Sequence, residues 1–86
     1  MRTKIHCLKV WPEYFKEVEA GSKLFEIRKD DRGFSVGDAV LLEEWDPKPK
    51  EFTGRVLLFA ITYILRNSEQ LSLLQDGVVV LGIRRI

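Results

Sequence analysis

The sequence predicts a mainly β, α+β domain of about five strands with one clear helix. Five segments of the 86-residue chain show strand-like alternation or β-branched and aromatic enrichment. Only one segment repeats apolar residues at helical spacing. Five strands in so short a chain favour a small closed or nearly closed β-barrel with the helix packed at one side, because closure removes exposed strand edges. A chain of this length has room for a single domain, residues 1–86.

The first strand and the helix are predicted near the N-terminus. Residues 4–10 alternate weakly between polar and apolar side chains, which indicates a strand. Residues 12–20 predict a short amphipathic helix, because Pro12 suits the first helical position and Gly21 the position just past the end. The apolar side chains of this helix recur on one face, at Trp11, Tyr14, Phe15 and Val18.

The remaining elements follow in the C-terminal two thirds of the chain. The further predicted strands are residues 22–29, 39–45, 54–66 and 78–86. The third of these is apolar on both faces, which is typical of a central strand or of one bent across a barrel corner. Residues 46–50 contain two prolines and predict a polar, flexible tip. Residues 67–74 predict one helical turn.

Charge excludes one class of function. The chain holds 14 Lys and Arg against 13 Asp and Glu, a formal net charge of +1. A sequence-blind polyanion binder would need a large positive surplus. The charge is nevertheless uneven: eight basic against six acidic residues in 1–32, two against five in 33–53, and four against two in 54–86. A local basic face is therefore compatible with a near-neutral protein.

Cysteine and histidine are too few for a disulfide or a zinc site. Cys7 has no partner cysteine, and one His with one Cys cannot supply four soft metal ligands. We expect no metal and no cofactor. We also expect Cys7 to be a small buried apolar residue, and His6, on the opposite strand face, to form a structural hydrogen bond. The lack of a signal peptide and of an apolar run of about 20 residues predicts a soluble, cytoplasmic protein without a membrane partner.

The densest cluster of charged residues is 21–32, directly after the predicted helix. It holds four cations and three carboxylates. Glu26 and Arg28 share one strand face, whereas alternation places Lys23 on the other, so a bulge or the helix exit would have to bring Lys23 round. The pattern is compatible with a plain surface ion pair. It is also compatible with a polar cleft in which Lys23 and Arg28 bind phosphate or base edges.

These residues resemble a known signature. Gly21-x-Lys23-x-x-Glu26-x-Arg28 resembles the G-x-K-x-x-E-x-R motif of the ASCH (activating-signal-cointegrator homology) superfamily. Further segments, spread over residues 6–83, resemble a short bacterial and phage family of ASCH-like proteins of unknown function. They include Trp11-Pro12-Glu13-Tyr14-Phe15, Phe34-x-Val36-Gly37-Asp38, Glu44-Trp45-Asp46 and Thr62-Tyr63-Ile64-Leu65. The resemblance implies a PUA-like fold with a cleft at the helix-to-strand junction.

The resemblance also implies binding of RNA or nucleotides, the expected role of ASCH domains. The candidate ligand-binding residues are His6, Lys9, Lys23, Glu26, Arg28, Arg32, Trp45 and Arg55. Trp11 and Trp45 could act as platforms on which bases stack. For Trp11, hydrophobic packing of the helix is the more common role.

Two alternatives stay open. Small relatives of similar fold hydrolyse N4-acylated cytidine with a lysine, a threonine nucleophile and a downstream glutamate. Lys23 matches that lysine, but Glu26 stands at the threonine position, which argues against this activity. A hydrolase acting on a modified nucleobase or RNA would use Lys23 as base, a water nucleophile, and Glu26, Glu43 or Glu44 as acid partner. Alternatively, the acidic segment and proline-containing tip of residues 43–50 could serve a protein-interaction module.

Overall fold

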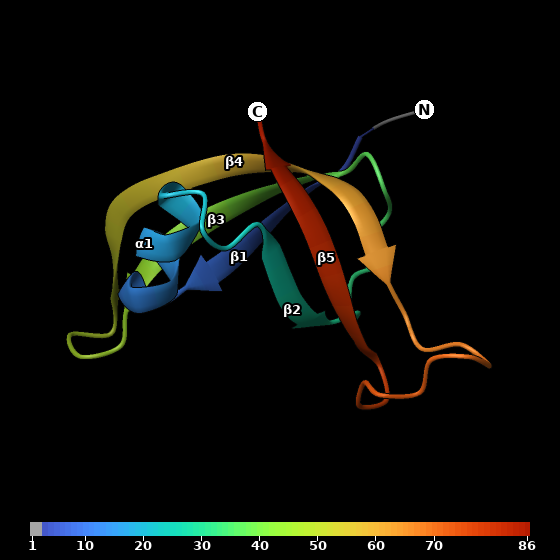
Figure 1. Cartoon of the computed structure of the whole chain (residues 1–86). Helices are drawn as coiled ribbons and strands as arrows, with labels where there is room; N and C mark the ends of the chain where they lie inside the picture. The colour runs from blue at the N-terminus through green and yellow to red at the C-terminus, as the bar shows by residue number, and fades with distance from the viewer. Residues whose placement is uncertain (1–2) are drawn as a thin grey trace.

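A computed structural model describes residues 3–86 as one curled five-stranded sheet with a short helix beside it (Figure 1). The elements are β1 (Ile5–Val10), α1 (Pro12–Glu19), β2 (Phe25–Lys29), β3 (Ala39–Asp46), β4 (Glu51–Leu65) and β5 (Val78–Arg85). The mainly β, α+β prediction is confirmed. Residues 1 and 2 of the predicted domain lie outside the described residues. No helix within residues 3–86 is long and apolar enough to cross a membrane.

The sheet has the strand order β1-β3-β4-β5-β2, so β1 and β2 form its two edges. β1 pairs with β3 in parallel, and the other neighbouring strands pair antiparallel. β4 pairs with β3 through residues 51–60 and with β5 through residues 59–65, so it links the two halves of the sheet. A register shift between Ile61 and Tyr63 marks a bulge, which bends and twists a strand. Of the two alternatives predicted for this segment, a central strand or a bent one, β4 shows both features.

Curling brings the two edge strands to face each other without joining them. In Figure 1, β2 lies opposite β1 across a gap, and helix α1 packs near one end of that gap. Over the described residues the sheet is therefore a half-barrel that stays open between β1 and β2. This open gap positions the candidate site.

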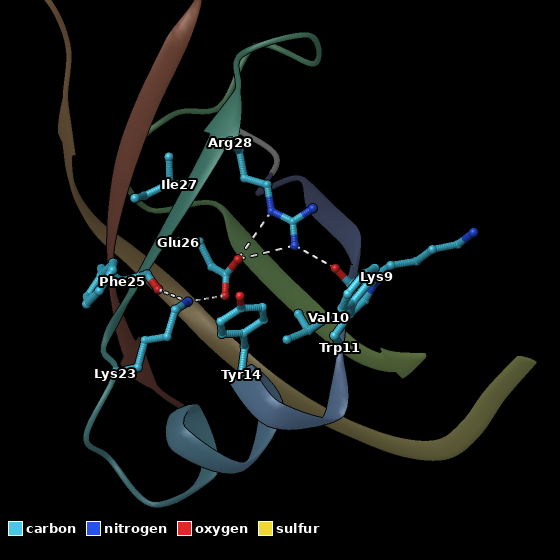
Figure 2. A pocket seen from close by; sticks show the side chains of 9 residues that line it. All are labelled: Lys9, Val10, Trp11, Tyr14, Lys23, Phe25, Glu26, Ile27 and Arg28. Atoms are coloured by element: carbon cyan, nitrogen blue, oxygen red, sulfur yellow. Dashed lines mark hydrogen bonds and ion pairs between the residues drawn. The ribbon is translucent and has the colours of Figure 1, made fainter. Parts of the chain in front are cut away.

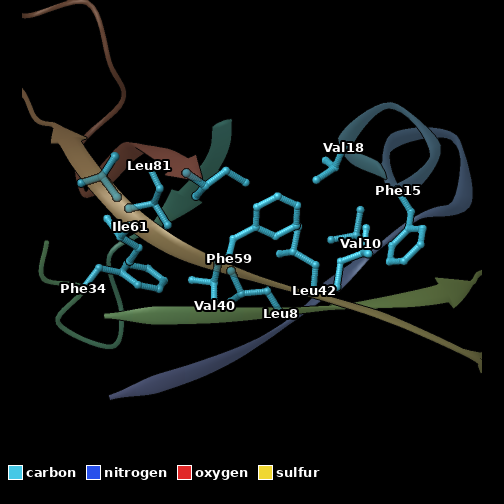
Figure 3. Close-up of a cluster of buried hydrophobic side chains, with 13 residues drawn as sticks. Leu8, Val10, Phe15, Val18, Phe34, Val40, Leu42, Phe59, Ile61 and Leu81 are labelled. Atoms are coloured by element: carbon cyan, nitrogen blue, oxygen red, sulfur yellow. The ribbon is translucent and has the colours of Figure 1, made fainter. Parts of the chain in front are cut away.

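The hydrophobic core fills the concave side of the sheet (Figure 3). Phe15 and Val18 of α1 are buried in it, as is Phe59 near the middle of β4. Burying each such side chain contributes about 1.5–3 kcal/mol. The predicted apolar helix face is thus split: Phe15 and Val18 pack in the core, whereas Trp11 and Tyr14 stay exposed.

The end of α1 determines where β2 begins. Gly21 adopts a φ of +82°, the left-handed conformation that glycine tolerates best, and the chain reverses there. The backbone N–H groups of Ser22 and Lys23 both donate to the carbonyl of Glu17, so these two residues still belong to the helix exit. β2 consequently begins at Phe25, three residues later than predicted.

Two predictions about local structure are wrong. Cys7 is exposed, because the inward face of β1 is formed by the alternate residues His6, Leu8 and Val10. Residues 67–74 form a loop instead of a helical turn. The side chain of Asn67 closes this loop, since its Nδ2 donates to the Leu74 carbonyl at 2.7 Å and its Oδ1 accepts from the Leu74 N–H at 3.0 Å.

Candidate ligand-binding cleft

A cleft of about 710 Å³ lies between the open edges of β1 and β2, beside the first turn of α1 (Figure 2). Its volume falls within the range of small-molecule pockets, roughly 300–1,000 Å³. The apolar lining residues are Val10, Trp11, Tyr14, Phe25 and Ile27. The charged lining residues are Lys9, Lys23, Glu26 and Arg28. The cleft therefore combines exposed aromatic walls with a small set of charged groups.

Glu26 is the buried charge of this cleft. Its side chain is 5% exposed, against 20% for Lys23 and 26% for Arg28. Oε1 accepts a hydrogen bond from Lys23 Nζ at 2.9 Å, and Oε2 accepts one from Arg28 Nε at 3.2 Å. A buried carboxylate is stable only when it is paired and hydrogen-bonded, and both oxygens of Glu26 meet this requirement. Glu26 thus holds the two cations side by side at the more exposed level of the cleft.

Lys23 reaches Glu26 because it precedes the strand. The alternation that would place it on the opposite face applies only from Phe25 onward, and the helix exit turns Lys23 toward the cleft. Its Nζ also donates to the Phe25 carbonyl at 2.7 Å and lies 4.9 Å from the centroid of the Phe25 ring. Three sequence-predicted site residues, Lys23, Glu26 and Arg28, therefore converge on one cleft, as Figure 2 shows.

Arginine side chains connect the two open strand edges. Arg28 Nη2, on β2, donates to the Lys9 carbonyl of β1 at 2.7 Å. Arg32, after β2, donates from Nη1 to the Cys7 carbonyl at 2.8 Å. Arg32 is therefore a bridge between the edges beyond the cleft lining, whereas Arg28 forms part of the lining itself.

Trp11 and Tyr14 form the aromatic side of the cleft next to α1. Trp11 and Tyr14 are 48% and 50% exposed, whereas Phe15 and Val18 on the same helix face are buried. Trp11, for which helix packing was the more common role, is the N-cap residue and remains outside the core. Sequence reasoning missed Tyr14 as a site residue. The available signal was the number of large apolar side chains on this short segment: the N-cap Trp11 and then Tyr14, Phe15 and Val18 of an eight-residue helix, more than one buried stripe needs.

The chain matches a family model described as "Domain of unknown function (DUF3850)" over residues 5–83. It belongs to this family. A protein of Escherichia phage P2, described as "Uncharacterized 12.9 kDa protein in GpA 3'region", is 39% identical to this chain over 71 residues. That alignment covers 83% of this chain and 63% of the phage protein, so the chain spans less than two thirds of that relative. The family match includes every residue that lines the cleft.

His6 lies away from the cleft in this DUF3850 domain. It is buried, its Nε2 lies 2.9 Å from Asp38 Oδ2, and its ring contacts Phe34 edge-on at 4.7 Å between centroids. The hydrogen bond with His6 holds the pKa of Asp38 below its ordinary value of 3.8, against the opposing effect of burial. Backbone N–H groups of Ser35 and Lys4 lower it further. His6 therefore has the expected structural role.

Lys9 and Trp45 meet on the outer face of the sheet. Lys9 Nζ lies 4.7 Å from the centroid of the Trp45 ring and 5.7 Å from that of Phe52. In Figure 2 the Lys9 side chain points away from the cleft, to which Lys9 contributes its backbone. Trp45 is outside the set of lining residues. Of the two tryptophans, Trp11 is therefore the one placed to contact a ligand in the cleft.

Glu44 and Arg55 form a separate cluster beneath α1. Glu44 is buried, and its Oε1 accepts a hydrogen bond from Thr53 Oγ1 at 2.7 Å. Arg55 Nη1 lies 3.7 Å from Glu44 Oε2, and Arg55 Nη2 pairs with Glu19 of α1. The Arg55 guanidinium also lies 5.1 Å from the centroid of the Phe15 ring. This cluster connects the helix to the sheet. Neither Glu44 nor Arg55 lines the cleft, and Lys23 is paired with Glu26 instead of Glu44.

Proposed function

We propose that this DUF3850 domain is an ASCH-type, PUA-like module that binds RNA or a nucleotide in the cleft between β1 and β2. The observation that carries the proposal is the convergence of Lys23, Glu26 and Arg28 beside two exposed aromatic rings. The resemblance of residues 21–28 to the ASCH signature supports it, because all three charged signature residues line the cleft.

Electrostatics favour an anionic ligand. Because the Lys9 side chain points away from the cleft (Figure 2), the charged side chains inside it are the cations Lys23 and Arg28 and the carboxylate of Glu26. This leaves a local excess of one positive charge within a small cavity. Lys23 Nζ uses two of its three hydrogens in the bonds to Glu26 and Phe25, which leaves one for a ligand. Arg28 uses Nε and Nη2, and its Nη1 stays available for a phosphate oxygen. A ligand phosphate would therefore accept hydrogen bonds from these two remaining donors, and not from the groups already paired with the Glu26 carboxylate.

The aromatic walls favour a base attached to that phosphate. Stacking of a base on an aromatic side chain contributes about 1–3 kcal/mol and tolerates any base, because every base has a π face. Trp11 and Tyr14 offer such rings at the side of the cleft, half exposed and therefore accessible. The cleft thus offers aromatic rings to the base of a nucleotide and cationic donors to its phosphate.

The same geometry supports binding over hydrolysis. Lys23 Nζ already donates hydrogen bonds to the Glu26 carboxylate and to a backbone carbonyl, so a role as base would require it to leave both partners. Glu26 carries no hydroxyl nucleophile, and Glu44 is engaged with Thr53 and Arg55 away from the cleft.

A titration of fluorescently labelled single-stranded RNA, followed by anisotropy at two salt concentrations, tests the proposal. The double variant Lys23→Gln/Arg28→Gln keeps amide donors for Glu26 and removes both charges. Its affinity should fall by about 100-fold or more, because each charged hydrogen bond contributes about 1.5–3 kcal/mol. Lys29→Gln, on the same strand but outside the lining, is the control. Absence of saturable binding at low salt, or equal binding by the double variant, would refute the proposal.

A further inference from the structure

The backbone of β2 has one edge that its neighbour β5 does not use. The Asp30 N–H donates to the Gly77 carbonyl at 2.7 Å, and the Ile83 N–H donates to the Leu24 carbonyl at 3.2 Å. Hydrogen-bonded and non-hydrogen-bonded pairs alternate along an antiparallel ladder, so these two bonds determine the direction of every backbone group between them. The residues whose N–H and C=O groups point away from β5 are Phe25, Ile27 and Lys29.

Two contacts show that the open edges of β2 and β1 both face the cleft. Lys23 Nζ, a lining group, donates to the Phe25 carbonyl. Across the gap, Arg28 Nη2 donates to the Lys9 carbonyl on the open edge of β1. Both carbonyls are thus already occupied by cations of the cleft. Ile27, which also lines the cleft, stands opposite Val80 in a non-hydrogen-bonded pair, so β5 uses neither its N–H nor its C=O.

An N–H donor beside a C=O acceptor on one strand edge complements the Watson–Crick edge of a nucleobase, which presents adjacent acceptor and donor groups. Uracil, for example, offers O4 and N3–H. We infer that the cleft reads the Watson–Crick edge of an unpaired base through the N–H and C=O of Ile27, an inference that rests on the proposed function. The base then lies between the strand edges, near Trp11 and Tyr14, and its phosphate lies at Lys23 and Arg28.

This arrangement defines a substrate class. A base in a duplex already uses its Watson–Crick edge, so the cleft takes single-stranded RNA or a free nucleotide and rejects paired RNA. Because the recognition groups belong to the backbone, no side-chain substitution in the signature would remove them. Discrimination among bases is modest, since each base can offer one donor and one acceptor on this edge.

The first test compares three single-stranded oligomers of equal length and charge, made of uridine, N3-methyluridine or 5-methyluridine. The methyl group on N3 blocks the Watson–Crick edge, whereas the methyl group on C5 lies on the opposite edge. Loss of the paired contacts should weaken binding of the N3-methyl oligomer by about tenfold, and the 5-methyl oligomer should bind like uridine. Equal affinity for all three oligomers would overturn this inference and leave the proposed function standing. No binding of any oligomer would overturn both.

The second test removes the Ile27 donor. Proline is tolerated on an edge strand where its missing N–H faces outward, which is the situation of Ile27 and of Lys29. Ile27→Pro should weaken binding of the uridine oligomer by about tenfold, while Lys29→Pro, outside the lining, should bind like the unmodified protein. Equal binding by both variants would contradict the inference. If Ile27→Pro does not fold, amide hydrogen exchange of the unmodified protein decides instead: the ligand should protect the Ile27 amide and leave that of Lys29 unprotected.

Discussion

Two buried glutamates of this domain look alike in isolation and differ in what surrounds them. Glu26 and Glu44 are both buried, and each contacts an arginine and a second donor. The arginine of the second cluster, Arg55, turns to Glu19 and to the ring of Phe15, so the cluster is completed by the helix it fixes. Arg55 is half-exposed, but its partners are Glu19 and Glu44 of the fold, and it lies outside the cleft lining.

The cluster of Glu26 is completed differently. Its arginine, Arg28, crosses an open gap to the backbone of Lys9, and its lysine bonds the backbone of Phe25. Both cations line a cleft that also has aromatic walls. A buried, paired carboxylate is therefore not by itself the mark of a binding site. What distinguishes the two clusters is whether the cations that pair with the carboxylate also line a cavity.

The largest expected difference between the two clusters is in RNA affinity after loss of an arginine. Arg28→Gln should weaken binding of single-stranded RNA by about 10-fold to 100-fold, the equivalent of about 1.5–3 kcal/mol for a charged hydrogen bond. Arg55→Gln should leave the affinity unchanged, since Arg55 lies outside the lining. Both are measured by the same anisotropy titration. Equal weakening by the two variants would show that bulk charge, and not the cleft, attracts the RNA.

The two tryptophans extend the comparison to the aromatic groups. Trp11→Ala removes a wall of the cleft and should weaken RNA binding by about tenfold, within the stacking contribution of about 1–3 kcal/mol. Trp45→Ala removes a ring that contacts Lys9 on the outer face and should have no such effect. Isothermal titration calorimetry with one oligonucleotide measures both variants. A larger loss in Trp45→Ala than in Trp11→Ala would move the binding surface away from the cleft.

The cluster of Glu44 should affect folding instead. Glu44→Ala removes the hydrogen bond from Thr53 and the pairing with Arg55, and both partners can return to water. The free energy of unfolding should fall by about 1 kcal/mol, the usual contribution of one net hydrogen bond. Chemical denaturation measures this change, with RNA affinity as the second reading. An unchanged stability together with weakened RNA binding would assign Glu44 to the ligand site.

The smallest expected effect concerns acid stability and the third buried carboxylate, Asp38. Its folded pKa lies below its ordinary value of 3.8 because of His6, so its contribution is fully present above that value and is lost as the pH falls below it. Asp38→Asn should therefore be less stable than the unmodified protein at neutral pH, and the difference should shrink in acid. Denaturation at a series of pH values measures it. A difference that stays constant down to the lowest pH would contradict the assignment.

Periodicity predicted most of the fold because the relevant signals are local. The helix, the five strands and the bend in β4 follow from apolar spacing, β-branched residues and glycines. Which face of a strand is buried depends on which face of the sheet the core covers, and alternation along one strand does not reveal that. Cys7 was therefore expected inside and lies outside, whereas its neighbour His6 is buried.

The candidate site was predictable in composition but not in geometry. Residues 21–28 stood out by charge, yet strand alternation separated Lys23 from Glu26, and only the turn at the helix exit reunites them. Tyr14 resembled a core residue because the width of an apolar helix face does not say how much of it the sheet will cover. The separation of Arg55 from the cleft depends on its ion pair with Glu19 of α1, a contact distant in sequence that local patterns do not encode.

The most direct measurement of the central claim uses the indole N–H signals of Trp11 and Trp45 in a nitrogen-15 NMR spectrum. One ring lines the cleft and the other lies outside it, so the protein carries its own control. Addition of single-stranded RNA should shift the Trp11 signal in a saturable manner and leave that of Trp45 in place. Neither signal shifting, or the Trp45 signal shifting alone, would contradict ligand binding between the two open strand edges.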